Sequence, residues 1–273
     1  MLADLHVHTK ASDGLYSAEA VCAMAVKAGL SAIAITDHDT LEGFLSLKAP
    51  VAGLKVIPGV EISTTWQGQD IHMLGYNVSL DRGFLGEKLL WFQGERRRRL
   101  TKIIAKLQDM GYEITEDEVK AYAEGQSFGR PHVAQALISK GYFQDMKTVF
   151  DKLLKAGAPA YVSREKITPQ EGMEAILSCG GVPVLAHPGL AKDSLELIGE
   201  LVPFGLKGVE VYYPLHSEEF IRNLLKITEV YSLLATGGSD FHGFTGDYLG
   251  KGSVDLSLVG LILDKFEYTS NDF

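Results

Sequence analysis

Residues 2–8, LADLHVH, form a short apolar run that ends in two metal-binding side chains, His6 and His8. Six further apolar runs end in the same way. They end at Asp37-His38, Glu61, His72, His187, His216 and Asp240-Phe241-His242. In a barrel of parallel strands, the side chains at the carboxyl ends of the strands point into one mouth. We therefore expect these residues to gather at a single site that holds several metal ions.

The alternation of apolar and polar stretches predicts strands joined by helices. We expect strands at residues 2–7, 32–36, 55–61, 70–76, 182–186, 208–211 and 232–236. Helices are predicted after Ser17, Thr40 and Thr168, whose hydroxyl groups can cap a first turn. Such alternation is typical of a parallel sheet. The link 67–69 is short and suits a hairpin, so we expect strand 70–76 to be antiparallel to the strand before it.

The middle of the chain lacks strand signals and is predicted to be a helical insertion. Its helix signals are the long charged stretch 84–110, a capping box of Thr115 with Glu118, Pro131 at a first helical position, and Asp145 before another helix. We expect a barrel of residues 1–80 and 161–273 that carries the metal site. Residues 81–160 are expected to form the insert and to contribute to substrate binding.

Composition and charge narrow the class of protein. The 273 residues are 46% hydrophobic, enough for a large buried core, and the formal net charge is -9. An acidic protein is poorly suited to hold duplex nucleic acid by neutralising its phosphates. The run from Arg96 to Arg99 does not change this expectation, because four consecutive residues point in different directions around a helix. We expect these arginines to lie on a solvated face.

Cysteine usage and hydropathy indicate the compartment. Cys22 and Cys179 are far apart and form no CxxC pair, so neither a disulfide nor a thiolate metal site is predicted. The N-terminus lacks the basic and long apolar regions of a signal peptide, and no window has the apolar length of a membrane span. We expect a cytoplasmic protein without membrane contact. The sequence leaves the oligomeric state open.

The types of candidate ligand restrict which metal ions the site can hold. Imidazole and carboxylate without thiolate suit Mn, Fe or Zn, whereas Mg prefers oxygen ligands. We favour Mn, with two or three ions. Several divalent ions side by side make hydroxide available at neutral pH and neutralise charge on a phosphoryl group. A lone histidine is more often structural than a ligand, and His132 is the one that is hardest to separate from that role.

The motifs resemble those of the polymerase and histidinol phosphatase (PHP) superfamily over the whole chain. They are His6-x-His8, Asp13, Thr36-Asp37-His38-Asp39, Gly59-Val60-Glu61, Asp70-Ile71-His72, His187-Pro188-Gly189 and Ser239-Asp240-Phe241-His242. Within the insert, Phe128 to His132, Thr148 to Phe150 and Ala160 to Val162 resemble stand-alone PHP phosphoesterases. Members of that branch remove the 3′-phosphate from nucleoside 3′,5′-bisphosphates and degrade short oligonucleotides from the 5′ end.

The resemblance implies a distorted seven-stranded β/α barrel with up to three metals at its mouth. The ligands it implies are His6, His8, Glu61 and Asp240 for one metal, Glu61, His72 and His187 for a second, and Asp13, His38 and His242 for a third. Asp37 and Asp39 are expected to orient His38, or to form a turn and helix cap before Thr40.

Three further residues are candidates for substrate binding. Arg130 precedes Pro131, so its guanidinium and the free N–H groups of a helix start could hold one phosphate together; the alternative is a surface arginine. His216 could bind the same phosphate or protonate the leaving oxygen, or it is a plain loop histidine. His132 could also contact substrate. With the ligand Asp240, Arg130 and His216 are the expected catalytic residues.

The expected activity is metal-dependent hydrolysis of a phosphate ester in a small nucleotide or a short 5′-phosphorylated oligonucleotide. A histidinol-phosphate phosphatase is the nearest alternative, since its substrate is also a phosphate monoester. A metal-dependent amidohydrolase would also open with His-x-His, but such sites commonly add a lysine at a mid-barrel strand end, and none stands there. A non-catalytic metal-binding domain is disfavoured by the complete ligand set.

Overall fold

The computed structural model describes residues 1–79, 83–123, 125, 127–163, 165–244 and 249–263. The strands are β1 (Leu2–Val7), β2 (Ala32–Ile35), β3 (Lys55–Trp66), β4 (Gln69–Tyr76), β5 (Val182–Leu185), β6 (Gly208–Tyr212), β7 (Leu234–Gly237) and β8 (Val254–Asp255). The α-helices are α1 (Ala18–Lys27), α2 (Glu42–Leu45), α3 (Phe84–Asp109), α4 (Glu116–Lys120), α5 (Arg130–Ser139), α6 (Met146–Val149), α7 (Pro169–Ser178), α8 (Ser194–Leu201), α9 (Glu218–Tyr231) and α10 (Gly260–Leu263). A π-helical turn, Phe150–Leu154, continues α6.

The strands form one barrel-like sheet in the order β7-β6-β5-β4-β3-β2-β1-β8. Neighbours are parallel except at β3–β4, β4–β5 and β1–β8. A parallel bridge between Val7 and Phe241 draws the end of β1 to the segment after β7, so the sheet is nearly closed. The mixed barrel class is confirmed, but the expected count of seven strands is wrong. The eighth strand has two residues, too few for an alternating pattern.

Most predicted elements are confirmed with shifted ends. The hairpin of β3 and β4 is antiparallel as expected, but β3 runs on to Trp66 instead of ending at Glu61. Thr168 and Thr115 both head complete capping boxes. Helix α5 begins at Arg130, one residue before the expected first position at Pro131. None of the described helices is both long and apolar enough to cross a membrane.

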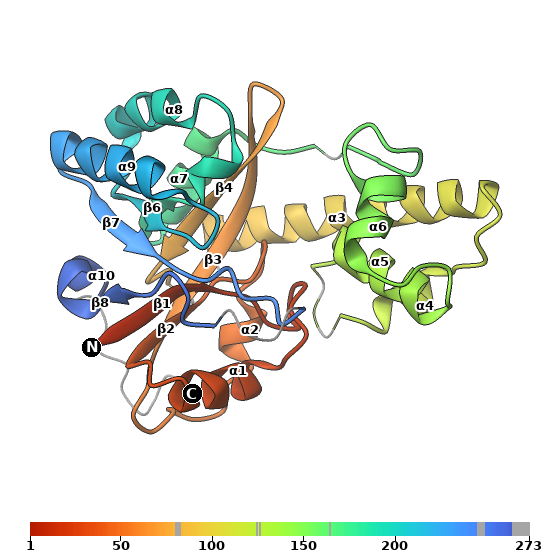
Figure 1. Cartoon of the computed structure of the whole chain (residues 1–273), viewed down its shortest axis with the longest axis horizontal. Helices are drawn as coiled ribbons and strands as arrows, with labels where there is room; N and C mark the ends of the chain where they lie inside the picture. Colours follow the sequence, from red (N-terminus) through yellow and green to blue (C-terminus); the bar gives the residue numbers. More distant parts are fainter. Residues whose placement is uncertain (80–82, 124, 126, 164, 245–248, 264–273) are drawn as a thin grey trace.

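Helix α3 joins the barrel to the helical region. Its first half buries Leu85, Leu89 and Phe92 in the core that lies under α7 and α8. Its second half belongs to a separate core with α4, α5 and α6, to which Ile103 and Leu107 contribute. Figure 1 shows those helices gathered around the far end of α3, away from the sheet. The boundary at residue 81 stays a prediction, since the helical region begins inside a helix that is partly barrel core.

Candidate metal centre

The ends of six strands deliver the expected ligands to one place. His6 and His8 end β1, His38 and His187 follow β2 and β5, Glu61 and His72 lie within β3 and β4, Asp240 and His242 follow β7, and Asp13 lies in the loop after β1. The apolar residues between them bury the strands, and the side chains beyond the buried runs reach the mouth of the barrel. All nine side chains expected to bind metal are therefore neighbours.

Glu61 lies at the centre of this group and is fully buried. Five histidine nitrogens lie close to its carboxylate: His6, His8 and His38 at 3.2, 3.1 and 2.9 Å from Oε2, and His72 and His187 at 2.7 and 3.0 Å from Oε1. Each oxygen of one carboxylate thus faces a different set of imidazoles. With its two oxygens facing different imidazoles, Glu61 would be able to contribute an oxygen to each of two cations.

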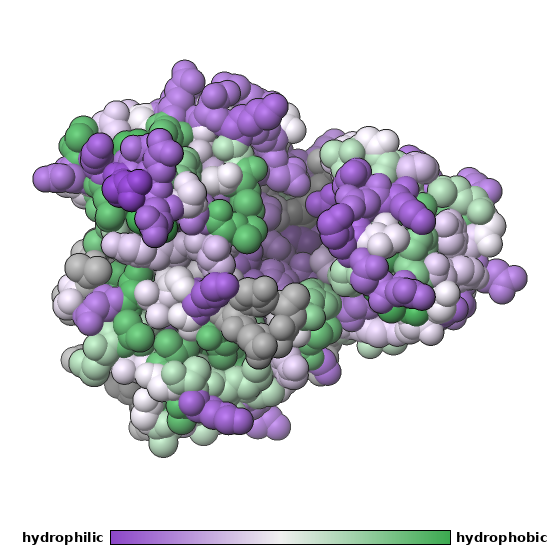
Figure 2. Space-filling model, viewed as in Figure 1, coloured by the Kyte–Doolittle hydropathy of each residue, from purple (hydrophilic) through white to green (hydrophobic). Residues whose placement is uncertain are grey.

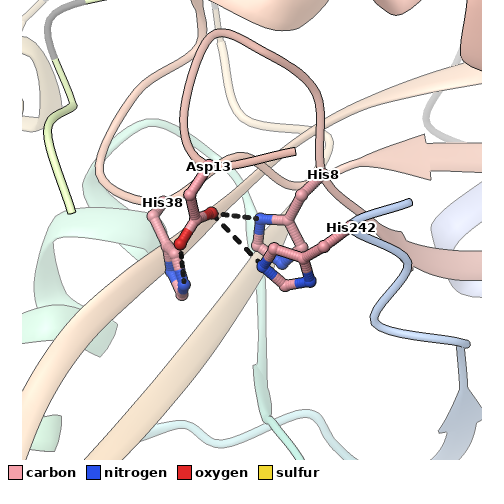
Figure 3. A group of neighbouring side chains, drawn as sticks. All are labelled: His8, Asp13, His38 and His242. Carbon is pink, nitrogen blue, oxygen red and sulfur yellow. Dashed lines mark ion pairs between the residues drawn. The ribbon is translucent and has the colours of Figure 1, made fainter. Parts of the chain in front are cut away.

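A second group surrounds Asp13, as Figure 3 shows. Its Oδ1 lies 3.2 Å from Nε2 of His242 and 3.9 Å from Nδ1 of His8, and its Oδ2 lies 3.9 Å from Nε2 of His38. Asp240 completes the cluster, with Oδ1 3.1 Å from Nε2 of His8. His8 therefore stands between the Asp13 group and the Glu61 group.

The donor atoms form three sets that could each hold a cation. They are His6, His8, Glu61 and Asp240; His38, Glu61 and His72; and His8, Asp13, His38 and His242. Within each set the donor atoms lie within 4.8 Å of one another. The first set is the one that the family resemblance implies. The other two sets differ from those that the resemblance implies, because His38 joins Glu61 and His72, and His8 joins Asp13, His38 and His242. The ring of His187 lies 3.0 Å from Oε1 of Glu61 but belongs to none of the three sets.

Several buried atoms of the cluster have only the ion-pair contacts given above and no hydrogen bond of regular geometry among the described residues. They are Asp13 Oδ1, His38 Nδ1, Glu61 Oε2 and His72 Nδ1. An unsatisfied buried polar atom costs about 1–3 kcal/mol, so it is rare unless something else satisfies it. Imidazole and carboxylate donors without thiolate fit divalent ions such as Mn, Fe or Zn. The residues present fit such ions.

The carboxylates and imidazoles shift one another's pKa. Burial alone would raise the pKa of Glu61, but the charges of neighbouring histidines, His38 first, hold it well below its usual range. Burial would lower the pKa of His8, yet hydrogen bonds and charges of Asp240 and Glu61 raise it to about 10. For His72 burial prevails and lowers the pKa to about 4, despite Glu61. Without cations the site is therefore held together by buried ion pairs, and His72 is neutral at pH 7.

Glu210, which the sequence did not reveal as a site residue, contacts two of the proposed ligands, His6 and His187. Its side chain is fully buried on β6. One carboxylate oxygen lies 3.0 Å from Nδ1 of His6, and the other accepts a hydrogen bond of 2.7 Å from the backbone N–H of His187. His187 has a φ of 25°, an unfavourable backbone conformation that persists only where surrounding contacts, such as this hydrogen bond to Glu210, hold it in place. A charged residue inside the otherwise apolar run 208–212 was the signal that could have revealed it.

Tyr213 was missed as well. It is buried, and its hydroxyl donates a hydrogen bond of 3.1 Å to Oδ2 of Asp240. The Oδ1 atom of Asp240 thus faces the imidazoles, while its Oδ2 atom is held by the hydroxyl of Tyr213. In the sequence Tyr213 lies two residues beyond the predicted strand 208–211, where an aromatic side chain carries no distinct signal.

Asp37 and Asp39 have other contacts than those expected. Asp37 accepts hydrogen bonds from the backbone N–H and the hydroxyl of Thr9 and from the hydroxyl of Ser12, so it holds the loop after β1. Asp39 forms a buried ion pair of 2.6 Å with Arg96 and accepts from the backbone N–H of Ser63. None of these contacts orients His38 or caps α2, so those parts of the expectation were wrong, whereas the expected turn is present at Asp39, which has a φ of 53°.

The expectation that the arginine run is a solvated face is also wrong at Arg96. Its side chain is only 7% exposed, and it ties α3 to the barrel through Asp39 and the hydroxyl of Ser63. Arg99 donates to the carbonyl oxygen of Val162 at 2.7 Å. Arg97 and Arg98 are exposed, as predicted for the whole run. Spacing along a helix could not reveal a partner 57 residues away.

The insert places Arg130 beside the cluster. A cavity of about 210 Å³ has a lining that includes Asp13, His38, Asp70 and His72 near the cluster, Arg96 and Arg99 of α3, Arg130 of α5, Phe150, and Lys166 before α7. Figure 2 shows a hydrophilic hollow between the barrel and the helical region. The guanidinium of Arg130 donates to the carbonyl oxygen of Leu154 at 3.2 Å and lies 5.7 Å from the ring centre of Phe150. Lys166 forms an ion pair with Asp70 at the same cavity.

His132 and His216 are held by backbone groups. His132 is buried, and its Nδ1 accepts a hydrogen bond of 3.0 Å from the backbone N–H of Gly129, next to Arg130. Nδ1 of His216 lies 2.9 Å from the carbonyl oxygen of Val211, while Nε2 accepts from the N–H of Gly189 at 3.1 Å. Both ring nitrogens of His216 are thus engaged, and its proton is fixed on Nδ1. These contacts position loops near the site.

Comparison with known proteins agrees with this geometry. The PHP domain model matches residues 4–163. The chain belongs to the PHP domain family. It is 33% identical over 248 residues to the 5′-3′ exoribonuclease Rnm of Escherichia coli, covering 88% of this chain and 84% of that protein. It is 30% identical over 246 residues to a 3′,5′-nucleoside bisphosphate phosphatase of Chromobacterium violaceum, covering 88% and 86%.

A solved structure agrees at the level of the fold. A proposed metal-dependent phosphoesterase of Bifidobacterium adolescentis superimposes with a TM-score of 0.89 at 29% identity and covers 97% of this chain and 96% of that one. Family membership, these relatives and the ligand cluster together make this PHP protein a metal-dependent phosphoesterase, as the sequence predicts.

Proposed function

We propose that this PHP enzyme hydrolyses the 3′-phosphate ester of small nucleotides that carry a 5′-phosphate. A nucleoside 3′,5′-bisphosphate and water would give a nucleoside 5′-monophosphate and inorganic phosphate. Short 5′-phosphorylated oligonucleotides would be cut at the equivalent ester. The names of the Escherichia coli and Chromobacterium violaceum relatives support this substrate class. Two unpaired cysteines fit a cytoplasmic location, where such nucleotides arise.

The nine clustered residues are proposed as ligands of two or three divalent ions, with Mn favoured. They are His6, His8, Asp13, His38, Glu61, His72, His187, Asp240 and His242. When bound, such ions lower the pKa of water and neutralise negative charge on a phosphoryl group. The unsatisfied buried atoms of Asp13, His38, Glu61 and His72 support this assignment.

The observation that carries the substrate proposal is the lining of the cavity of about 210 Å³ beside the cluster. It combines three proposed metal ligands, Asp13, His38 and His72, with four cationic side chains, Arg96, Arg99, Arg130 and Lys166, and one further carboxylate, Asp70. A molecule with two phosphates can place one at the metal ligands and the other at the cationic side chains. A molecule with a single phosphate leaves the cationic side chains without an anion from the substrate. Histidinol phosphate is of the second kind, so the cavity favours a bisphosphate over it.

Arg130 is proposed to hold the 5′-phosphate. Its contacts with Leu154 and the Phe150 ring fix the guanidinium at the cavity, which lowers the entropy lost when it grips an anion. The ion pair partner Asp70 is 3.8 Å away and is half exposed, so this contact is weak and can yield to phosphate. His132 supports Arg130 indirectly by anchoring the N–H of Gly129.

The remaining catalytic proposals concern Asp240 and His216. Asp240 is proposed as a ligand whose carboxylate is held in place by Tyr213. His216 donates one ring proton to Val211 and accepts from Gly189, so it is proposed to shape the phosphate site through the loop 187–190. Because both ring nitrogens of His216 already have backbone partners, we favour this role over that of the acid that protonates the leaving oxygen.

The test is phosphate release by Mn-loaded enzyme from adenosine 3′,5′-bisphosphate, adenosine 3′-phosphate and histidinol phosphate, in the wild type and in Arg130→Ala and Arg130→Lys. We expect the bisphosphate to be the best substrate. Arg130→Ala should lower its kcat/KM by about 10- to 100-fold, since one charge-assisted contact is worth about 1.5–3 kcal/mol. Lysine should restore little, because it lacks the bidentate fork.

Adenosine 3′-phosphate serves as the internal control, since it has no 5′-phosphate for Arg130 to hold. Its kcat/KM should change less than threefold in either variant. An equal loss on both substrates would assign Arg130 to the reacting phosphate or to the fold. Preference of the wild type for histidinol phosphate would reject the nucleotide proposal.

A further inference from the structure

A second hollow adjoins the phosphate cavity on the flank of α3. It has a volume of about 410 Å³ and is lined by Glu95, Arg98, Arg99, Lys102, Ser163 and Glu165. Arg99 lines both this hollow and the cavity beside the metal centre. A ligand that fills the cavity can therefore extend past Arg99 without leaving the protein surface. We refer to this second region as the α3 hollow.

The positions of its cations follow from the helix. Arg98 and Arg99 lie four and three residues before Lys102, so the three side chains share one face of α3. Three residues advance a helix by about 4.5 Å, so the long side chains of Arg99 and Lys102 lie near enough to reach one short run of anionic groups in the α3 hollow.

Tyr161 connects the two cationic regions. Its ring centre lies 5.6 Å from the guanidinium carbon of Arg99 and 5.8 Å from that of Arg130. Cation–π contact with one ring holds both guanidinium groups at the junction of the cavity and the α3 hollow. A phosphate gripped by Arg130 consequently lies near a second cation, Arg99, which also lines the α3 hollow.

The charges of the α3 hollow are mixed, which limits what it can hold. Glu95 is engaged in an ion pair with Arg98. Glu165 is exposed and adds a negative charge at the rim. Lys102 is exposed as well, and among the described residues the structure gives it no hydrogen bond or ion pair. The balance suits one or two additional anionic groups on a small ligand rather than a long polyanion.

We propose that the enzyme accepts 3′-phosphorylated nucleotides whose 5′-phosphate carries further phosphoryl groups, that is, nucleoside 3′-phosphate 5′-diphosphates and 5′-triphosphates. This proposal rests on the proposed function, with the 3′-phosphate at the metal centre and the first 5′-phosphate at Arg130. The outer phosphoryl groups lie in the α3 hollow, between Arg99 and Lys102. The bond that is broken remains the 3′-phosphate ester: water adds, inorganic phosphate leaves, and the 5′ anhydride stays intact.

The experiment compares kcat/KM for adenosine 3′-phosphate 5′-diphosphate and adenosine 3′,5′-bisphosphate. Wild-type enzyme is expected to use the diphosphate at least as well as the bisphosphate, with adenosine 5′-diphosphate and phosphate as products. Lys102→Ala should lower kcat/KM for the diphosphate about three- to tenfold, as expected for one partly exposed charge-assisted contact. The same variant should change the bisphosphate less than twofold.

Lys147→Ala is the matched control, since Lys147 is an exposed lysine on α6 that pairs with Asp151 and lines neither hollow. It should leave both substrates unchanged. Equal losses on both substrates in Lys102→Ala would show general attraction of anions and overturn the proposal. Poor use of the diphosphate by a wild type that is active on the bisphosphate would overturn it and leave the proposed function intact. Inactivity on both nucleotides would reject the proposed function itself.

Discussion

Replacement of Glu210 by glutamine tests whether the support behind the cluster sets metal affinity. To present Nε2 to a cation, His6 must carry its proton on Nδ1, where Glu210 accepts it at 3.0 Å. The other carboxylate oxygen accepts the N–H of His187 at 2.7 Å. A glutamine has one oxygen, so in either orientation its NH₂ group faces one of these two donors. Glu210→Gln therefore leaves one buried donor without an acceptor.

An unsatisfied buried donor costs about 1–3 kcal/mol, which corresponds to a roughly 5- to 150-fold loss of affinity if the cost falls on the metal-bound state. Outer partners of metal-bound histidines show losses of about 10- to 100-fold. The measurement is the Kd for Mn by competition with a chelator at constant pH. Thermal unfolding of the metal-free protein shows how much of the cost is structural.

The exposed Glu174 on α7 provides the control, and Glu174→Gln should bind Mn like the wild type. The decisive comparison for Glu210→Gln is between the change in the Kd for Mn and the change in the Tm of the metal-free protein. A lower Tm of the metal-free protein with unchanged Kd for Mn would mean that Glu210 only stabilises the barrel. The argument that it orients His6 would then fail.

Two further perturbations have expected outcomes. In the metal-free protein Asp240 and Glu61 raise the pKa of His8 to about 10, so His8 is protonated at pH 7. Mn binding must release that proton. The apparent affinity for Mn should therefore rise between pH 6 and 8. Calorimetry in two buffers of different ionisation enthalpy measures the release, and zero protons would refute this account. Arg96→Leu removes the guanidinium partner of the buried Asp39 and should cost about 3–5 kcal/mol of unfolding free energy, and adding Asp39→Asn should recover part of that loss. Additive losses in urea unfolding would contradict the pairing.

Prediction from the sequence succeeded where one short run contains both the structural and the chemical signal. A strand such as β1 is apolar because it is buried, and it ends in histidines because they lie at the mouth of the barrel. Parallel pairing then brings separate strand ends together without further information. The hairpin of β3 and β4 was equally local, since a three-residue link decided it.

The failures involve contacts between distant segments. Arg96 is buried because Asp39, far away in the chain, lies opposite it, and the spacing of the arginines carries no trace of that partner. Glu210 acquires its role only when β6 pairs with β5 and lies behind the end of β1. Strand β8 is defined by its pairing with Leu2 and Ala3 rather than by a pattern of its own. Such features follow from the closed sheet and not from any single stretch.

The distribution of charge explains how an acidic protein can act on anionic substrates. The formal net charge is -9, yet Glu61 and Asp240 face imidazoles and the proposed cations. The two carboxylates that line the cavity, Asp13 and Asp70, are paired with His242 and Lys166. The cavity itself collects arginine and lysine from α3, α5 and the segment before α7. Because the Debye length is about 8 Å at physiological ionic strength, the negative surface beyond these side chains is largely screened. Substrate anions therefore encounter the local cations, and we expect the remaining acidic surface to disfavour long nucleic acids, which must contact much more of the protein.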